Sequence, residues 1–232
     1  MTLALPHWTA DLKVAVVSDL HVGSPHVGPD RLRRLVAEIN DRHPDIVLLL
    51  GDFVVADSLS RNAITAARIA VELQQLNPPL GTYAVLGDSD NAYGGKNVYD
   101  ALTYLGLHAL ENEAVRVERE SGSFWIAGVA DSKTSQPDIE TTLEPVAGDE
   151  PVLLITHNPD LFPDVPESVS LTLAGHTHGG QISLPFLRHP QSGHIVESGR
   201  HLFVTTGIGT SGVPARLGVP PEIVILHLTR PR

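Results

Sequence analysis

The sequence predicts an α/β fold, a four-layer α-β-β-α sandwich of two mixed β-sheets flanked by helices. Two observations support this prediction. In the first half of the chain, short apolar runs rich in β-branched residues alternate with segments of helical periodicity. In the second half, short strand-like runs follow one another with few helices between them. The first pattern favours a helix-covered sheet, and the second favours another sheet packed against it.

Three strands and three helices are predicted in the first half. The helix after the first strand has Leu32, Leu35, Val36 and Ile39 at helical spacing, and Pro29 suits its first turn. This βαβαβα order is typical of parallel strands covered on both faces. The predicted strands are 13–18, 45–50 and 82–86, and the predicted helices are 29–43, 62–76 and 98–105.

The second half predicts a more antiparallel sheet packed on the first. Residues 185–199 are rich in proline and glycine and predict a long loop, and long loops are often functional. No linker, repeat or low-complexity tract interrupts the chain, so residues 1–232 are expected to form one domain. The predicted strands are 114–117, 124–129, 152–156, 171–174, 181–184, 202–205 and 223–228.

Composition narrows the class of function. The chain has 232 residues, 42% of them hydrophobic, which is enough for a substantial core without disulfides or structural metals. The net charge of −11 argues against a nucleic-acid-binding surface and against docking on anionic lipid. The absence of cysteine excludes disulfides, thiolate zinc sites and cysteine nucleophiles.

The first residues lack a basic segment followed by a long apolar run, so a signal peptide is not expected. No stretch approaches the roughly 20 apolar residues that a transmembrane helix needs. These features predict a soluble, cytoplasmic protein, unless the chain derives from a longer precursor.

Carboxylates and imidazoles follow five of the predicted strands. Ligand sites in open α/β sheets lie beyond the carboxyl ends of the strands, so these side chains are expected to meet at one rim. The segments are Ser18-Asp19-Leu20-His21, Gly51-Asp52, Gly87-Asp88-Ser89-Asp90, Thr156-His157-Asn158 and Gly175-His176-Thr177-His178-Gly179-Gly180.

Divalent metals would offset the repulsion among so many acidic groups in one place. Residues two apart in an extended or turning backbone can point the same way, so the Asp-x-His and His-x-His pairs can each chelate one ion. A set of Asp and His ligands without sulfur suits Mn²⁺, Zn²⁺ or Fe and is less typical of Ca²⁺.

These segments, in this order, resemble the calcineurin-like metallophosphoesterase superfamily. The longer string from Gly175 to Gln181, with residues 207–216 and 220–222, is similar to its YkuE/YaeI-like bacterial phosphodiesterase branch. The resemblance extends from about Val14 to Leu228. It implies hydrolysis of a phosphodiester, phosphomonoester or pyrophosphate by a hydroxide that bridges two metals.

The resemblance also implies the ligands of each metal. One ion would be held by Asp19, His21, Asp52 and His178. The second would be held by Asp52, Asp88, His157 and His176, so that Asp52 bridges the two.

Asp88 departs from the family pattern, which has Gly-Asn-His-Asp or Gly-Asn-His-Glu where this chain has Gly-Asp-Ser-Asp. The change replaces a neutral carbonyl ligand with a carboxylate. Three carboxylates and a bridging hydroxide would then neutralise two divalent cations, whereas the usual pattern leaves one positive charge. A neutral centre is expected to attract and polarise a phosphate anion less.

Ser89 replaces the histidine that lies near the leaving group in the family. General acid catalysis of this kind is worth about 10²- to 10⁴-fold, and a serine hydroxyl is a poor acid near neutral pH. Weak turnover of esters with poor leaving groups is therefore expected. Asp90, Asn91, His189 and His194 are alternatives for the missing acid, and the sequence does not choose among them.

The expected catalytic residues are thus Asp52, Asp88 and Ser89, and Arg216 is a candidate for binding the substrate phosphate or for pairing with an acid. The substrate is expected to be a small-molecule or lipid-linked phosphoester. Two alternatives stand beside this hypothesis. The fold could serve as a metal-binding or partner-binding module with little catalysis, or as a nuclease, which the charge of −11 disfavours.

Overall fold

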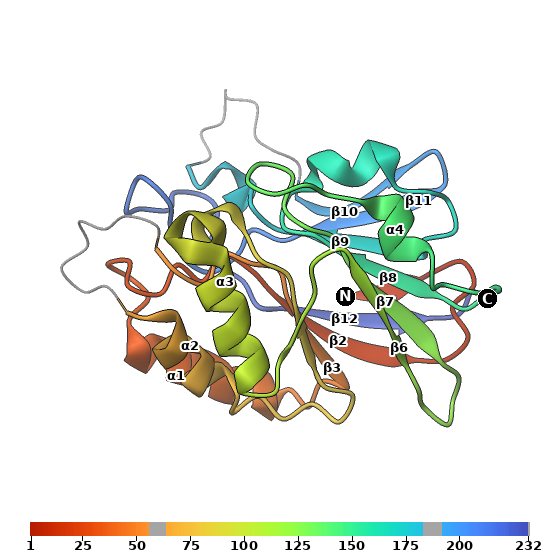
Figure 1. The fold of residues 1–232 in the computed structure, drawn as a ribbon, viewed down its shortest axis with the longest axis horizontal. Helices are drawn as coiled ribbons and strands as arrows, with labels where there is room; N and C mark the ends of the chain where they lie inside the picture. Colours follow the sequence, from red (N-terminus) through yellow and green to blue (C-terminus); the bar gives the residue numbers. More distant parts are fainter. Residues whose placement is uncertain (56–63, 183–191, 232) are drawn as a thin grey trace.

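The computed structural model describes residues 1–55, 64–182 and 192–231, and its two six-stranded sheets stack face to face between layers of helices (Figure 1). In the first sheet, only the β12–β2 pairing is antiparallel. The strands of this sheet, in spatial order, are β1 (Thr2–Ala4), β12 (Val224–Thr229), β2 (Leu12–Val17), β3 (Ile46–Leu49), β4 (Thr82–Ala84) and β5 (His108–Ala109).

The second sheet is parallel at its centre and antiparallel at both edges. The expectation of a more antiparallel second sheet is therefore met only in its outermost pairs. Its strands, in spatial order, are β10 (Gly193–Glu197), β11 (Arg200–Val204), β9 (Leu171–Ala174), β8 (Val152–Ile155), β7 (Phe124–Gly128) and β6 (Glu113–Val117).

Helices cover the outer faces of both sheets. Figure 1 shows α1, α2 and α3 beside the first sheet and α4 over the second. The helices are α1 (Pro29–Asp41), α2 (Ala66–Leu73), α3 (Asp88–Tyr104) and α4 (Ile139–Leu143), with 3₁₀ turns η1 (Pro159–Asp164) and η2 (His178–Gly180). Together with the two sheets they form the predicted α-β-β-α sandwich, which confirms the fold class.

The layers follow from the alternation of side chains along each strand. In β2, Val14 and Val16 point into the core between the sheets, where they pack with residues such as Phe124 of β7. Ala15 and Val17 point the other way, into the core formed with α1, α2 and α3. A third cluster lies between the second sheet, α4 and η1. Because these strands are buried on both faces, their sequences are continuous apolar runs.

Four sequence predictions about elements were wrong. The third helix begins at Asp88 instead of residue 98, because Gly87 caps it and the Asp90 carboxylate accepts the Gly87 N–H at 3.0 Å, and a kink at Gly94 separates these first turns from the predicted segment. Gln181 and Ile182 form no strand, and Ile182 makes only an isolated bridge with Leu217. Residues 193–197, assigned to a loop, form β10 by pairing with β11. The run 223–228 belongs to the first sheet, where it pairs with β1 and β2.

Parts of other predictions lie outside the described residues. These are residues 62–63 of the predicted helix, residues 183–184 of the predicted strand, and residues 185–191 of the predicted loop, His189 among them. Among the described residues, no helix is long and apolar enough to cross a membrane.

Leu48 tests the core between the sheets. Its side chain is 0% exposed, so Leu48→Ala is expected to lower the free energy of unfolding by about 2–5 kcal/mol, measured by urea denaturation. Tyr104→Ala is the control, because Tyr104 is 90% exposed and its loss should change stability by no more than about 0.5 kcal/mol. Equal effects of the two substitutions would contradict the assigned core.

Candidate metal centre

The carboxyl ends of five strands bring seven predicted ligands together. β2 leads to Asp19 and His21, β3 to Asp52, and β4 to Asp88 at the start of α3. In the second sheet, β8 leads to His157 and β9 leads to the His176–His178 segment. The rim predicted from the sequence is therefore formed by both sheets, at the end where their parallel strands terminate.

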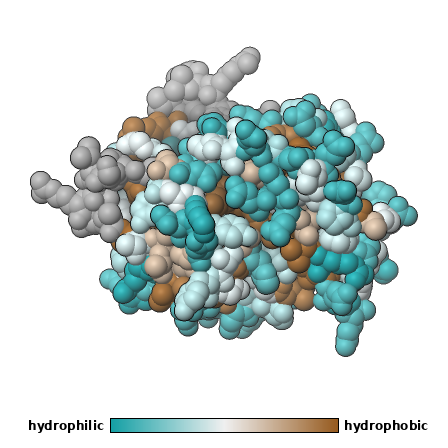
Figure 2. Space-filling view, viewed as in Figure 1, coloured by the Kyte–Doolittle hydropathy of each residue, from teal (hydrophilic) through white to brown (hydrophobic). Residues whose placement is uncertain are grey.

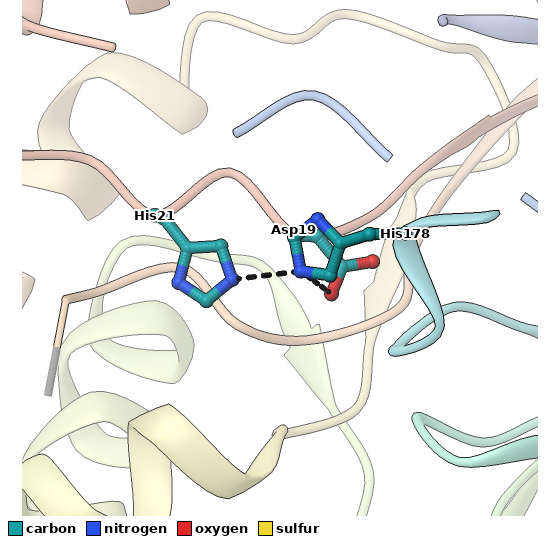
Figure 3. A group of neighbouring side chains, drawn as sticks. All are labelled: Asp19, His21 and His178. Carbon is teal, nitrogen blue, oxygen red and sulfur yellow. Dashed lines mark hydrogen bonds and ion pairs between the residues drawn. The ribbon is translucent and has the colours of Figure 1, made fainter. Parts of the chain in front are cut away.

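Asp19, His21 and His178 form a first group of possible ligands (Figure 3). His21 Nε2 lies 3.2 Å from His178 Nε2, and His178 Nε2 lies 3.3 Å from Asp19 Oδ1. Asp19 is completely buried, yet its Oδ1 has no hydrogen-bond partner among the described residues. A buried carboxylate oxygen without a donor is costly, and a cation would satisfy it.

Asp88, His157 and His176 form a second group. Asp88 Oδ1 lies 3.2 Å from His157 Nε2 and 3.0 Å from His176 Nδ1. The two imidazole nitrogens are 3.2 Å apart. The three ligand atoms thus converge on one point, as the ligands of a single ion do.

Asp52 connects the two groups. Its Oδ2 lies 3.3 Å from His21 Nε2 in the first group, and its Oδ1 lies 3.5 Å from His157 Nε2 in the second. The side chain is almost fully buried. One carboxylate therefore presents one oxygen to each group, which is the arrangement expected of a bridging ligand.

Five of the seven residues have a left-handed backbone. This region costs non-glycine residues roughly 1–3 kcal/mol each and is least unfavourable for Asn, Asp and His. Such a conformation turns the chain sharply at the end of a strand and directs the side chain over the rim. The residues and their φ angles are Asp19 (55°), His21 (42°), Asp52 (57°), His176 (64°) and His178 (51°).

Backbone hydrogen bonds hold these turns. Asp90 is completely buried, and its carboxylate accepts the N–H groups of Asp52, Phe53 and Val54 at 2.8–3.1 Å, in addition to that of Gly87. It thereby ties the turn after β3 to the start of α3. This role of Asp90 is not among the sequence predictions, although an acid three residues after a helix-capping position is a recognisable signal.

His157 has a defined ring orientation. Its Nδ1 donates to the Leu50 carbonyl oxygen at 2.6 Å, so Nε2 faces Asp52 and Asp88. A hydrogen bond of this kind fixes the tautomer of a metal-binding histidine.

Ser89 contacts the connecting carboxylate. Its backbone N–H donates to Asp52 Oδ1 at 2.9 Å, and its hydroxyl donates to Asp52 Oδ2 at 3.0 Å. The side chain is mostly buried. Gly87 lies against the same carboxylate, and a Cβ added there would be 2.7 Å from the Asp52 backbone nitrogen. The start of α3 therefore fits closely around Asp52.

Arg216 lies beside the first group. Its Nη2 contacts His178 Nδ1 at 3.1 Å and donates to the Thr206 carbonyl oxygen, and its Nε donates to the Gly209 carbonyl oxygen. Nη1 is buried without a hydrogen-bond partner among the described residues. The guanidinium is thus engaged mainly with the protein, and it does not pair with a carboxylate in the described chain.

Burial and charge shift the pKa values of the site in opposite directions. Burial raises the pKa of Asp52, and the nearby His157 only partly offsets it. Hydrogen bonds from His157 and His176 hold the pKa of Asp88 below its usual range. Burial lowers the pKa of His178 to about 4, so this imidazole is neutral at pH 7 and free to bind a metal.

These observations can be compared with known proteins. Residues 12–195 match the model of the family described as calcineurin-like phosphoesterase. The chain belongs to the calcineurin-like phosphoesterase family. This finding confirms the resemblance drawn from the strand-end segments.

Relatives of this family cover nearly the whole chain. Identity is 32% with an uncharacterized metallophosphoesterase of Aquifex aeolicus and 31% with the uncharacterized metallophosphoesterase YkuE of Bacillus subtilis. These alignments cover 98% and 97% of this chain and 88% and 81% of the relatives. A Danio rerio transmembrane protein with a metallophosphoesterase domain is 31% identical over 97% of this chain, which spans only 54% of that protein.

Two solved structures share the fold. SoxB, a sulfate thiohydrolase of Thermus thermophilus, has a TM-score of 0.57 at 13% identity, covering 93% of this chain and 56% of that one. A dimetal phosphatase from Danio rerio has a TM-score of 0.52 at 13% identity, covering 84% of this chain and 87% of that one. At this identity the likeness concerns the fold alone.

The protonation of His157 is expected to make metal binding depend on pH. Burial lowers its pKa, but Asp52 and Asp88 outweigh burial and raise the pKa to about 10, so the metal-free imidazole is protonated at pH 7. A metal that binds Nε2 must displace this proton. The apparent association constant for Mn²⁺ is therefore expected to rise about tenfold per pH unit between about pH 6 and 9.

Titration calorimetry in buffers of different ionisation enthalpy measures this displacement and should find about one proton released from His157 per chain, on binding of the ion held by the second group. His227→Ala is the control, because His227 is exposed on β12 and should leave the slope unchanged. An affinity that does not vary with pH would contradict the protonated His157.

Proposed function

We propose that this protein is a dinuclear metal-dependent phosphoesterase, a hydrolase of phosphodiesters, phosphomonoesters or pyrophosphates. The single observation that carries the proposal is the position of the Asp52 carboxylate, with one oxygen toward each of two groups of ligands. Membership of the calcineurin-like phosphoesterase family supports the reaction class.

The donors fit two divalent cations. Each group supplies one carboxylate oxygen and two imidazole nitrogens and shares Asp52, and the unpartnered Asp19 Oδ1 is suited to accept a cation. This set favours Mn²⁺, Zn²⁺ or Fe. Such ions would activate a water molecule and neutralise charge on the phosphoryl group. The ligands would be Asp19, His21, Asp52 and His178 for one ion, and Asp52, Asp88, His157 and His176 for the other.

The protein's own contribution is to hold this site in place before substrate arrives. Ser89 and the Asp90-bound turn fix Asp52, and the Leu50 carbonyl fixes His157. Preorganised groups need no rearrangement during the reaction, which is a main source of enzymatic rate acceleration. Asp88 adds a negative charge that reduces the attraction of the centre for a phosphate anion.

A small-molecule phosphoester is the favoured class of substrate. The net charge is −11, and the face in Figure 2 is largely hydrophilic with small, scattered hydrophobic patches. Nucleic-acid nucleases need a basic surface along the polymer, which the overall charge disfavours.

His176→Ala tests the function. The unmodified protein is expected to bind two Mn²⁺ ions per chain and to hydrolyse bis(p-nitrophenyl) phosphate. Loss of one second-group ligand should lower metal content and reduce turnover at least a hundredfold. Metal content is measured by mass spectrometry after dialysis, and turnover by release of p-nitrophenolate.

His227→Ala is the matched control and should retain both metals and turnover, since His227 is exposed on β12. Two bound metals without turnover of any phosphoester would reject the enzyme and favour a second candidate, a metal-binding or partner-binding module. The observation that favours this second candidate is Ser89, whose hydroxyl donates to Asp52 and is a poor proton donor to a leaving group.

Ser89→His distinguishes a weakened enzyme from a fully active one. An imidazole at this position is expected to raise turnover of unactivated alkyl diesters by about tenfold or more, because it supplies a general acid. Hydrolysis of bis(p-nitrophenyl) phosphate should change less, because its leaving group needs little protonation. Unchanged turnover of the alkyl diesters, with metal content retained, would contradict the role assigned to position 89.

A further inference from the structure

Lys133 lies at the rim of the metal centre, in the segment between β7 and α4. Its ammonium group is in hydrogen-bond contact with His176 Nε2. The opposite edge of that ring, at Nδ1, faces Asp88 and His157. The Lys133 side chain is exposed, and within the described ranges it forms no ion pair with a carboxylate. A cation is thus held at the outer side of the ligand cluster without a neutralising partner.

The backbone that carries Lys133 is anchored. The buried Asp131 carboxylate accepts the N–H groups of Lys133 and Thr134 at 3.0 and 2.9 Å, and also the Thr134 hydroxyl at 2.7 Å. Asn91 of α3 donates to the same hydroxyl at 2.8 Å. Since Asn91 follows Asp88 by three residues, the segment is tied to the helix that begins at the metal centre.

The tautomer of His176 explains why this position suits an anion. If Nδ1 binds with Asp88 and His157, the neutral ring carries its proton on Nε2. In this structure the Lys133 ammonium donates to Nε2. A proton on Nε2 would end this hydrogen bond and leave Nε2–H and the ammonium as two neighbouring donors at the rim. With the ammonium turned away from Nε2, an anionic oxygen at the rim would accept from both.

We propose that Lys133, together with His176 Nε2–H, binds an anionic oxygen of the substrate phosphoryl group. This inference rests on the proposed function. A lysine ammonium binds phosphate as a compact point charge with three donors. It also compensates for Asp88, whose negative charge makes the metal centre neutral. The added cation favours a dianionic phosphomonoester over a monoanionic diester.

Lys133→Met tests the proposal by two measurements. Affinity of the Mn²⁺-loaded protein for inorganic phosphate, measured by calorimetry, should fall about tenfold or more, as expected for loss of one charge-assisted hydrogen bond. In kinetic assays, KM for p-nitrophenyl phosphate should rise several-fold more than KM for bis(p-nitrophenyl) phosphate. Metal content should be unchanged, because Lys133 is not a ligand.

Three variants separate charge from structure. Lys133→Arg keeps the cation and should retain most of the phosphate affinity. Thr134→Val keeps the charge but removes the hydroxyl that Asn91 and Asp131 hold, so it should weaken phosphate binding less than Lys133→Met. Lys96→Met is the matched control, because Lys96 is an exposed lysine of α3 that pairs with Asp100, and it should change nothing.

The outcomes distinguish this inference from the proposed function. Wild-type turnover with equal phosphate affinity in Lys133→Met and Lys96→Met would overturn the inference and leave the function standing. Phosphate binding that requires Lys133, without turnover of any ester, would support the anion site and reject the enzyme. A loaded wild-type protein that binds no phosphate would overturn the inference.

Discussion

The position of the Asp52 carboxylate is the constraint on which the site depends. It stands between two groups of candidate ligands, each of which draws residues from both sheets, and it is the residue that connects them. A buried carboxylate is unfavourable unless it is hydrogen-bonded or bound to a cation. Ser89 supplies two hydrogen bonds to it, and Asp90 binds the backbone of its turn, so a short segment at the start of α3 holds Asp52 in place.

The stacked sheets provide the rigid frame for this arrangement. Strands buried on both faces fix where each strand ends, and the left-handed turns that follow direct the ligands over a common rim. The conformational strain of these turns is offset by the packing and hydrogen bonds around them. Four histidines and three acids crowded into one site shift each other's protonation. The pKa of His157 is raised, and the pKa of His178 is lowered. Bound cations would offset the charge of the acids.

Much of the fold and of the candidate site could be predicted from the sequence, because apolar strand patterns and strand-end motifs are local signals. The seven predicted ligands come together because carboxyl ends of parallel strands share one edge. The remainder depends on contacts between distant segments. From the sequence, Ser89 is only the replacement for a catalytic histidine. Its hydrogen bonds to Asp52 join residues 37 positions apart, so no local pattern predicts them. The contact of Lys133 with His176 spans 43 residues and leaves no local pattern. Strand β10 exists because β11 pairs with it, and its proline- and glycine-rich surroundings favoured a loop.

We propose that Asp52 joins two metal ions in one centre. Electron paramagnetic resonance of the protein loaded with two equivalents of Mn²⁺ tests this bridge, because ions that share a carboxylate are magnetically coupled. We expect a coupled dinuclear spectrum that Asp52→Ala abolishes and His227→Ala retains. A six-line spectrum of isolated Mn²⁺ at two equivalents, or saturation at one ion per chain, would show that Asp52 does not bridge two ions.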